Sequence, residues 1–168
     1  MEGIMASYKA GKEEAIEWIK TNFEEGSTCL DVGCCDGKWS DLLQGYLKLD
    51  GIEAFAPNIS NHNLKPKYNK IVCADVRDFE FDWYDLIIFG DVIEHMTVKE
   101  AQKVIEYAWP RCKDMIVAVP FLHVQGAKYG NPFEIHKQSD LTNEVFNSRY
   151  PGFKPIFINT KYAYYTKE

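Results

Sequence analysis

Short apolar runs alternate along this chain with stretches whose apolar residues recur at helical spacing. Five runs predict buried strands, at residues 28–32, 49–57, 71–76, 84–91 and 114–120. Between and before them, helical spacing predicts helices over residues 13–23, 38–46 and 97–109. Strands that alternate with helices indicate a parallel sheet with right-handed crossover connections.

Several boundaries carry specific signals. Asp36 is placed to cap the helix 38–46, and Thr97 and Glu100 have the spacing of a capping box before the helix 97–109. Pro57 is expected to end the strand 49–57. Residues 57–70, which contain two prolines and four asparagines, are expected to form a loop or at most a short helical turn.

The last third of the chain predicts a helix over residues 139–150 and a closing hairpin from residues 155–160 and 162–168. The whole pattern predicts an α/β fold: a doubly wound, mostly parallel seven-stranded sheet with an antiparallel C-terminal hairpin and helices on both faces. With 168 residues, of which 46% are hydrophobic, we expect one domain over residues 1–168.

Charge and apolar run length limit the function. The net charge of −6 argues against nucleic-acid binding. No run approaches the roughly 18 apolar residues of a membrane span, and the N-terminus is charged rather than signal-like, so we expect a cytoplasmic protein.

Cysteines are the first candidates for chemistry. The five are Cys29, Cys34, Cys35, Cys73 and Cys112, an odd number without C-x-x-C spacing. That pattern is typical neither of a disulfide framework nor of a zinc site. Adjacent cysteines also fit disulfide geometry poorly, because their Cα atoms lie only about 3.8 Å apart.

The stretch around the adjacent pair instead predicts a ligand-binding loop. It reads Asp31-x-Gly33-x-Cys35-x-Gly37, between a strand and a helix, where backbone N–H groups can point at a polar ligand. Lys38 stands where the dinucleotide motif has its third glycine, which disfavours a nicotinamide oxidoreductase. The carboxylate of Asp31 would repel a pyrophosphate and suits a ligand that carries an ammonium group.

In this loop the chain resembles the class I (Rossmann-like) S-adenosylmethionine-dependent methyltransferases, whose first motif is (Asp/Glu)-x-Gly-x-Gly-x-Gly. Glu53, 22 residues after Asp31, matches the family's ribose-binding acid, and "CADV" and "GDVIEHM" match its later motifs. The resemblance covers about residues 8 to 168. It implies S-adenosylmethionine as cofactor, S-adenosylhomocysteine as product, and these cofactor-binding residues: Asp31, Gly33, Cys34, Cys35, Gly37, Glu53, Ala54, Asp75, Val76, Gly90 and Asp91.

The chain departs from the family at Cys35, which replaces the middle glycine. If this residue has a positive φ, the conformation costs roughly 1–2 kcal/mol. Cys35 is also expected near a helix N-terminus, which suggests the hypothesis that its thiol has thiolate character and is sensitive to oxidation. The helix between the second and third strands is reduced as well.

Asp91, Glu94 and His95 place two carboxylates and an imidazole within five residues, a set that can hold a divalent cation. Some relatives use a metal near this stretch. The alternative is that Glu94 and His95 make internal hydrogen bonds. Because no second group of ligands can be identified in the sequence, we expect no metal.

Residues 120–140, here called the lid segment, are rich in aromatic residues and predict a substrate lid after the fifth strand. A hydroxyl or amine acceptor must lose a proton, and histidine is the side chain suited to take it near neutral pH. The candidate catalytic bases are therefore His136, His123 and His95, in that order.

The resemblance implies transfer of a methyl group, and the lid segment is similar to the substrate cap of small-molecule methyltransferases. We therefore expect the acceptor to be a hydroxyl or amine of a small molecule or of a sugar-containing compound, and the protein to be a monomer or homodimer. The alternatives are a catalytically inactive module that binds S-adenosylmethionine, or a methyltransferase of proteins or nucleic acids.

Overall fold

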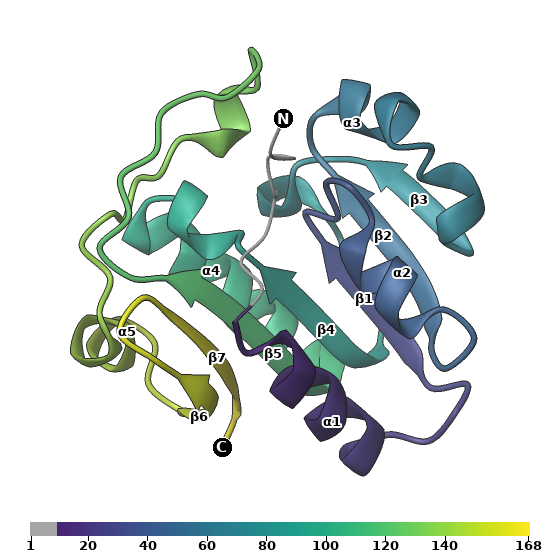
Figure 1. Cartoon of the computed structure of the whole chain (residues 1–168), viewed down its shortest axis with the longest axis horizontal. Coiled ribbons are helices and arrows are strands. Elements are labelled where there is room, and N and C mark those ends of the chain that lie inside the picture. The colour runs from purple at the N-terminus through teal and green to yellow at the C-terminus, as the bar shows by residue number, and fades with distance from the viewer. Residues whose placement is uncertain (1–9) are drawn as a thin grey trace.

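A seven-stranded sheet runs through the whole of the computed structural model, which describes residues 10–168 (Figure 1). Its strands are β1 Thr28–Val32, β2 Lys48–Glu53, β3 Lys70–Cys73, β4 Tyr84–Gly90, β5 Cys112–Pro120, β6 Phe153–Ile158 and β7 Tyr162–Lys167. They lie in the order β3-β2-β1-β4-β5-β7-β6. Strands β1 to β5 pair in parallel, and β7 runs antiparallel to both β5 and β6. The predicted fold class and the closing hairpin are confirmed.

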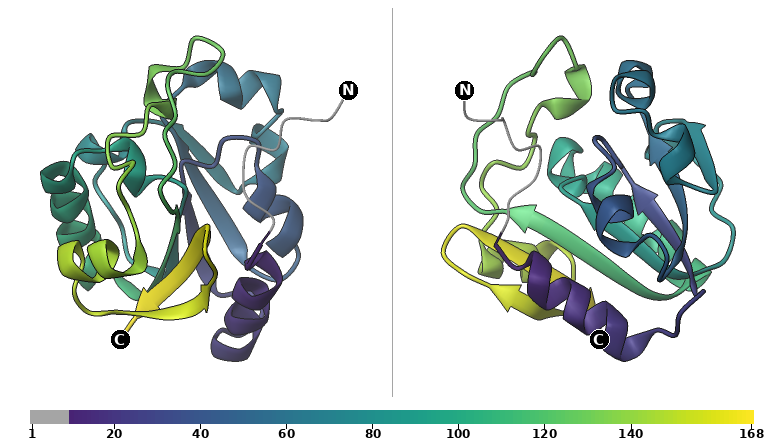
Figure 2. Two further views of the ribbon diagram at one scale, coloured as in Figure 1. Left: turned by 60° about the vertical axis from the view of Figure 1, so that its left-hand side comes forward. Right: turned by 45° about the vertical axis from the view of Figure 1, so that its right-hand side comes forward.

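Helices cover both faces of this sheet (Figure 2). They are α1 Lys12–Asn22, α2 Lys38–Leu43, α3 Ala56–Asn61, α4 Val98–Ala108 and α5 Asn143–Arg149. Apolar residues of α1 and α2 pack in one core, and those of α4 and α5 pack in a second core on the opposite face. Strand β7 serves both cores, since Tyr162 and Tyr164 lie in the first and Ala163 and Tyr165 in the second.

The capping box before α4 is confirmed. The Thr97 hydroxyl accepts a hydrogen bond from the Glu100 N–H at 3.3 Å, and the Glu100 carboxylate accepts one from the Thr97 N–H at 2.8 Å. The cap predicted at Asp36 is wrong by one residue: Gly37, in the left-handed region with φ +77°, is the cap residue of α2. Asp36 accepts a bond from the Lys38 N–H at 3.1 Å, so its carboxylate orders the turn beside the helix start.

Two strands end earlier than predicted. Strand β2 ends at Glu53 and β3 at Cys73, because the chain turns there into short helical segments. Pro57 does not end a strand. It lies in the first turn of α3, where a proline is tolerated because the N–H that it lacks has no partner within the helix.

The lid segment follows β5 and is irregular, as predicted, apart from one 3-10 turn at Pro132–Glu134. None of the helices formed by residues 10–168 combines the length and the apolar character that a membrane crossing requires. The predicted domain of residues 1–168 and the resemblance from residue 8 both include positions before residue 10, which lie outside the described residues.

Candidate active site

A cavity of about 1400 Å³ lies where the parallel strands end, between the loop after β1 and the lid segment. The order of the sheet reverses between β1 and β4, and ligands of open α/β sheets bind beyond the carboxyl ends of the strands at such a point. The three predicted catalytic histidines line this cavity. The predicted cofactor-binding residues that also line it are Asp31, Gly33, Cys34, Cys35, Glu53, Ala54, Asp75, Val76, Gly90 and Asp91. Gly37 is the exception, because it lies below the loop as the cap of α2.

The loop after β1 is held by its own backbone. The N–H groups of Gly33 and Cys34 donate to the Ile52 carbonyl at 2.9 and 3.1 Å, and the Gly37 N–H donates to the Cys34 carbonyl. The Cys35 N–H donates to the Glu53 carboxylate at 2.8 Å. Contrary to expectation, these four N–H groups do not point at a ligand: three attach the loop to β2, and the Gly37 N–H closes a turn within the loop.

Positive φ angles in this loop match the motif. Gly33 has φ +68°, and a Cβ atom placed on it would lie 2.7 Å from a methyl carbon of Val92. Cys35 has φ +44°, so the strained conformation anticipated for a residue in place of glycine is present.

Glu53 lies at the end of β2 with only 5% of its surface exposed. Its two carboxylate oxygens accept N–H bonds from Cys35 and Phe55, each at 2.8 Å. Burial raises the pKa of the Glu53 carboxyl, and the two backbone bonds oppose that rise. Each oxygen keeps a second lone pair, so the fixed carboxylate can accept hydrogen bonds from two neighbouring hydroxyls of a ligand.

Asp31, at the end of β1, is 1% exposed and accepts a 2.6 Å hydrogen bond from the Tyr68 hydroxyl. Burial raises the pKa of Asp31 to about 7, although the Tyr68 bond and the charge of Lys12 act against the rise. Lys12, a cavity residue that the sequence analysis missed, stands at the first position of α1, with its amine 4.9 Å from the centre of the Trp39 ring. Its position at a charged helix start resembled an ordinary solvated lysine.

Asp75 lies on the cavity wall but is engaged with Arg77. Arg77 Nε donates to the Asp75 carboxylate at 3.0 and 3.1 Å, and Arg77 also pairs with Glu100 at 2.8 Å. These hydrogen bonds lower the pKa of Asp75. Asp75 and Val76 therefore occupy the expected wall, with the carboxylate oriented by the arginine.

The thiolate hypothesis for Cys35 is wrong. Burial, followed by the nearby carboxylate of Glu53, raises the pKa of the Cys35 thiol to about 12. Burial raises the pKa of Cys34 as well. Helix α2 has only six residues, and its N-terminus does not offset these effects.

The turn after β4 holds acidic groups in unusual surroundings. Asp91 has φ +58° and accepts a hydrogen bond from the Tyr162 hydroxyl at 2.5 Å. Glu94 is 1% exposed, and among the described residues neither of its carboxylate oxygens has a hydrogen-bond partner; the same holds for Nδ1 of His95. Backbone groups do act on both side chains: the Glu94 backbone on its own carboxyl, and the backbones of Ile135, Glu134 and Asp91 on the His95 ring. The expected internal hydrogen bonds are therefore present only in part. Burial, and then the charge of Asp91, raises the pKa of Glu94.

Three histidines meet above this turn. The ring centre of His136 lies 4.7 Å from that of His95 and 5.1 Å from that of His123. Nδ1 of His136 lies 2.8 Å from the His123 carbonyl oxygen, which can only accept, so Nδ1 carries the proton. Burial lowers the pKa of His136 to about 4. Near neutral pH, Nε2 of His136 therefore offers a lone pair.

The sequence was compared with protein-family models and with curated proteins. The family model described as a methyltransferase domain matches residues 30–112. No curated protein matches the sequence.

Solved structures share the fold. The N-methyltransferase NodS from Bradyrhizobium japonicum WM9 is 11% identical, with a TM-score of 0.65 over 93% of each chain. An S-adenosylmethionine-dependent methyltransferase from Clostridium acetobutylicum ATCC 824 is 12% identical, with a TM-score of 0.71 over 95% of this chain and 91% of that one. The plantazolicin methyltransferase BpumL, in complex with S-adenosylhomocysteine, is 13% identical, with a TM-score of 0.68 over 93% of this chain and 81% of that one.

Proposed function

The chain belongs to the class I S-adenosylmethionine-dependent methyltransferases, and we propose that it methylates a hydroxyl or amine of a small-molecule or sugar-containing acceptor. The size of the cavity carries this proposal. Ligand pockets commonly enclose about 300–1,000 Å³, so a volume of about 1400 Å³ leaves room for an acceptor beside the cofactor.

Residues at or just beyond the carboxyl ends of four strands, β1 to β4, fit the cofactor. Glu53 would accept hydrogen bonds from the two ribose hydroxyls, because both of its oxygens are already oriented by backbone N–H groups. Asp31, at the base of the cavity, would attract the ammonium group of the methionine portion. Asp75 and Val76 would face the adenine, and Gly90 and Asp91 the methionine portion.

The histidines of the lid segment suit proton transfer. Bound S-adenosylmethionine supplies a methyl group already activated on a sulfonium sulfur, so the protein mainly positions the acceptor and excludes water. His136 would take the proton that the acceptor hydroxyl or amine loses as it bonds to the methyl carbon, since Nε2 is unprotonated near neutral pH. His123 and His95 are the next candidates for this role and lie against the same ring.

Three further observations support a small acceptor inside a cell. Two of the similar structures are named as an N-methyltransferase and as a plantazolicin methyltransferase. The net charge of −6 disfavours a polyanionic substrate. The cysteines are free thiols, which is consistent with a reducing compartment such as the cytoplasm.

Calorimetry with S-adenosylhomocysteine tests the cofactor site, and a screen of small-molecule extract with labelled methyl donor tests the acceptor. We expect saturable binding and label in a small product. His136→Ala should abolish turnover and keep cofactor binding, while Lys48→Ala, which removes an exposed side chain outside the cavity, should keep both. Label only in protein or nucleic acid would refute the acceptor class, and unchanged turnover in His136→Ala would refute the base.

A further inference from the structure

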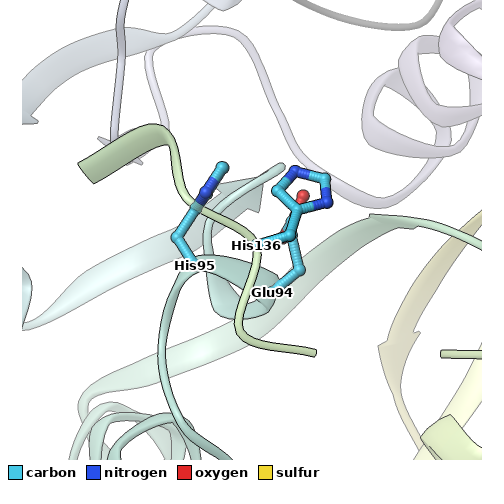
Figure 3. Close-up of side chains that lie close together, drawn as sticks. All are labelled: Glu94, His95 and His136. Carbon is cyan, nitrogen blue, oxygen red and sulfur yellow. The ribbon is translucent and has the colours of Figure 1, made fainter. Parts of the chain in front are cut away.

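We infer that Glu94, His95 and His136 form a binding site for a divalent first-row transition-metal ion. One ligand atom from each side chain can be chosen so that all three lie within 4.8 Å of one another. Glu94 and His95 come from the 3-10 turn Ile93–His95, and His136 comes from the lid segment (Figure 3). The third ligand therefore reaches the other two across more than 40 residues of sequence.

Burial of Glu94 is the strongest argument for a cation here. A carboxylate that is 1% exposed and accepts no hydrogen bond from another described residue is unfavourable, since removing an ion from water costs several kcal/mol. Asp91 and Glu134 add negative charge around it. A bound cation would compensate these charges and give the Glu94 oxygens and Nδ1 of His95 the partner that they lack among residues 10–168.

His136 has the hydrogen bond expected of a metal ligand. Metal-binding histidines usually donate their second ring N–H to a carbonyl or carboxylate, which fixes the tautomer. Nδ1 of His136 makes such a bond to the His123 carbonyl at 2.8 Å and thereby directs the lone pair of Nε2 away from it. This bond orients the ring before any ion binds.

The ligand set selects the class of ion. Two imidazoles and one carboxylate suit Mn²⁺, Fe²⁺, Co²⁺ or Zn²⁺, whereas Mg²⁺ and Ca²⁺ prefer oxygen ligands. Ligand atoms about 2.0–2.2 Å from an ion lie at most about 4.4 Å apart. The observed limit of 4.8 Å thus requires a small closure, which the irregular lid segment can provide through His136.

Three protein ligands leave coordination positions open on the cavity side. If the proposed function holds, these positions would hold the acceptor through a hydroxyl oxygen and favour hydroxyl over amine acceptors. Nε2 of His136 would then be occupied by the ion, and His123, which lies against the same ring, would take the acceptor's proton. Binding of the ion itself does not depend on that function.

Titration of untagged, chelator-treated protein with Co²⁺, followed by visible absorption, tests the site. We expect one Co²⁺ per chain with d–d bands of a nitrogen- and oxygen-ligated ion. Removal of a residue that only hydrogen-bonds to a metal ligand weakens metal binding about 10–100-fold. Glu94→Gln and His136→Ala change the ligands themselves, so each should weaken Co²⁺ binding at least about 10-fold. His62→Ala, which removes an exposed histidine outside the cluster, should bind Co²⁺ like the unmodified protein.

Parallel calorimetry with S-adenosylhomocysteine separates the two proposals. Absence of saturable Co²⁺ binding in protein that binds S-adenosylhomocysteine would overturn the metal site and leave the methyltransferase intact. Equal Co²⁺ binding by His136→Ala and the unmodified protein would also overturn it, and this variant carries the test if Glu94→Gln does not fold. Co²⁺ binding without binding of S-adenosylhomocysteine would instead count against the cofactor site alone.

Discussion

Replacing Asp31 with asparagine should make the protein more stable at alkaline pH while weakening the cofactor site. Asp31 is 1% exposed, and burial raises its pKa from 3.8 to about 7. Since the folded-state pKa is higher than the unfolded one, the contribution of this group to stability is full below pH 3.8 and is lost as the pH rises through about 7.

The magnitude follows from the two pKa values. With about 1.36 kcal/mol for each pKa unit, the ionised carboxylate lowers the free energy of unfolding by about 4 kcal/mol in the alkaline limit. Only part of this decrease in unfolding free energy falls within the pH range in which unfolding is readily measured. Between about pH 5 and about pH 8 the decrease is roughly 2.5 kcal/mol. Asparagine keeps an oxygen that can accept the Tyr68 hydroxyl and does not ionise.

Urea unfolding of both proteins across this range measures the effect. The difference in unfolding free energy, variant minus unmodified, should grow with pH by roughly 2.5 kcal/mol. Asp82→Asn, which replaces an exposed carboxyl, controls for the change in net charge. A difference for Asp31→Asn that is flat with pH would refute the reasoning, because Asp31 would then ionise alike in the folded and unfolded chains.

Three further changes test single contacts. Glu53→Ala should weaken binding of S-adenosylhomocysteine in calorimetry by about 1.5–3 kcal/mol, the range for hydrogen bonds to charged groups, and unchanged affinity would exclude Glu53 from the site. Thr97→Ala removes the capping box of α4 and should lower the unfolding free energy in urea by about 1 kcal/mol, whereas Thr97→Ser should keep it. Gly33→Ala combines φ +68° with a contact of 2.7 Å to Val92, so it should lower the thermal midpoint more than Gly26→Ala, which has φ +86° and nothing within 4 Å. Equal decreases in the thermal midpoint would mean that Val92 moves aside and relieves its contact with the new Cβ atom.

The sheet was predictable because its signals are local. Apolar runs such as residues 84–91 and the Thr97–Glu100 cap depend on neighbours in sequence. The run appears as β4, which is one residue shorter, and the cap appears where it was expected. Element ends were less predictable. Pro57 can end a strand or begin a helix, and only the packing of the surrounding chain decides between them.

The site was predictable as a set of positions but not as a set of contacts. The motif placed Asp31, Glu53 and Asp91 at one edge of the sheet, since carboxyl ends of parallel strands meet there. It could not show that the Cys35 N–H binds Glu53, or that His136 folds back onto His95, because both are tertiary contacts between separate segments. For the same reason the sequence offered no further ligand to join Glu94 and His95, and no metal was expected.

The bond between Tyr162 and Asp91 has a consequence for biosynthesis. Tyr162 opens β7, which enters the sheet between β5 and β6, and its hydroxyl reaches the turn after β4. A ribosome releases β7 after the other six strands of the sheet, so the pocket is incomplete while those strands emerge. A nascent chain therefore gains no protection from a ligand in this pocket until translation has passed β7.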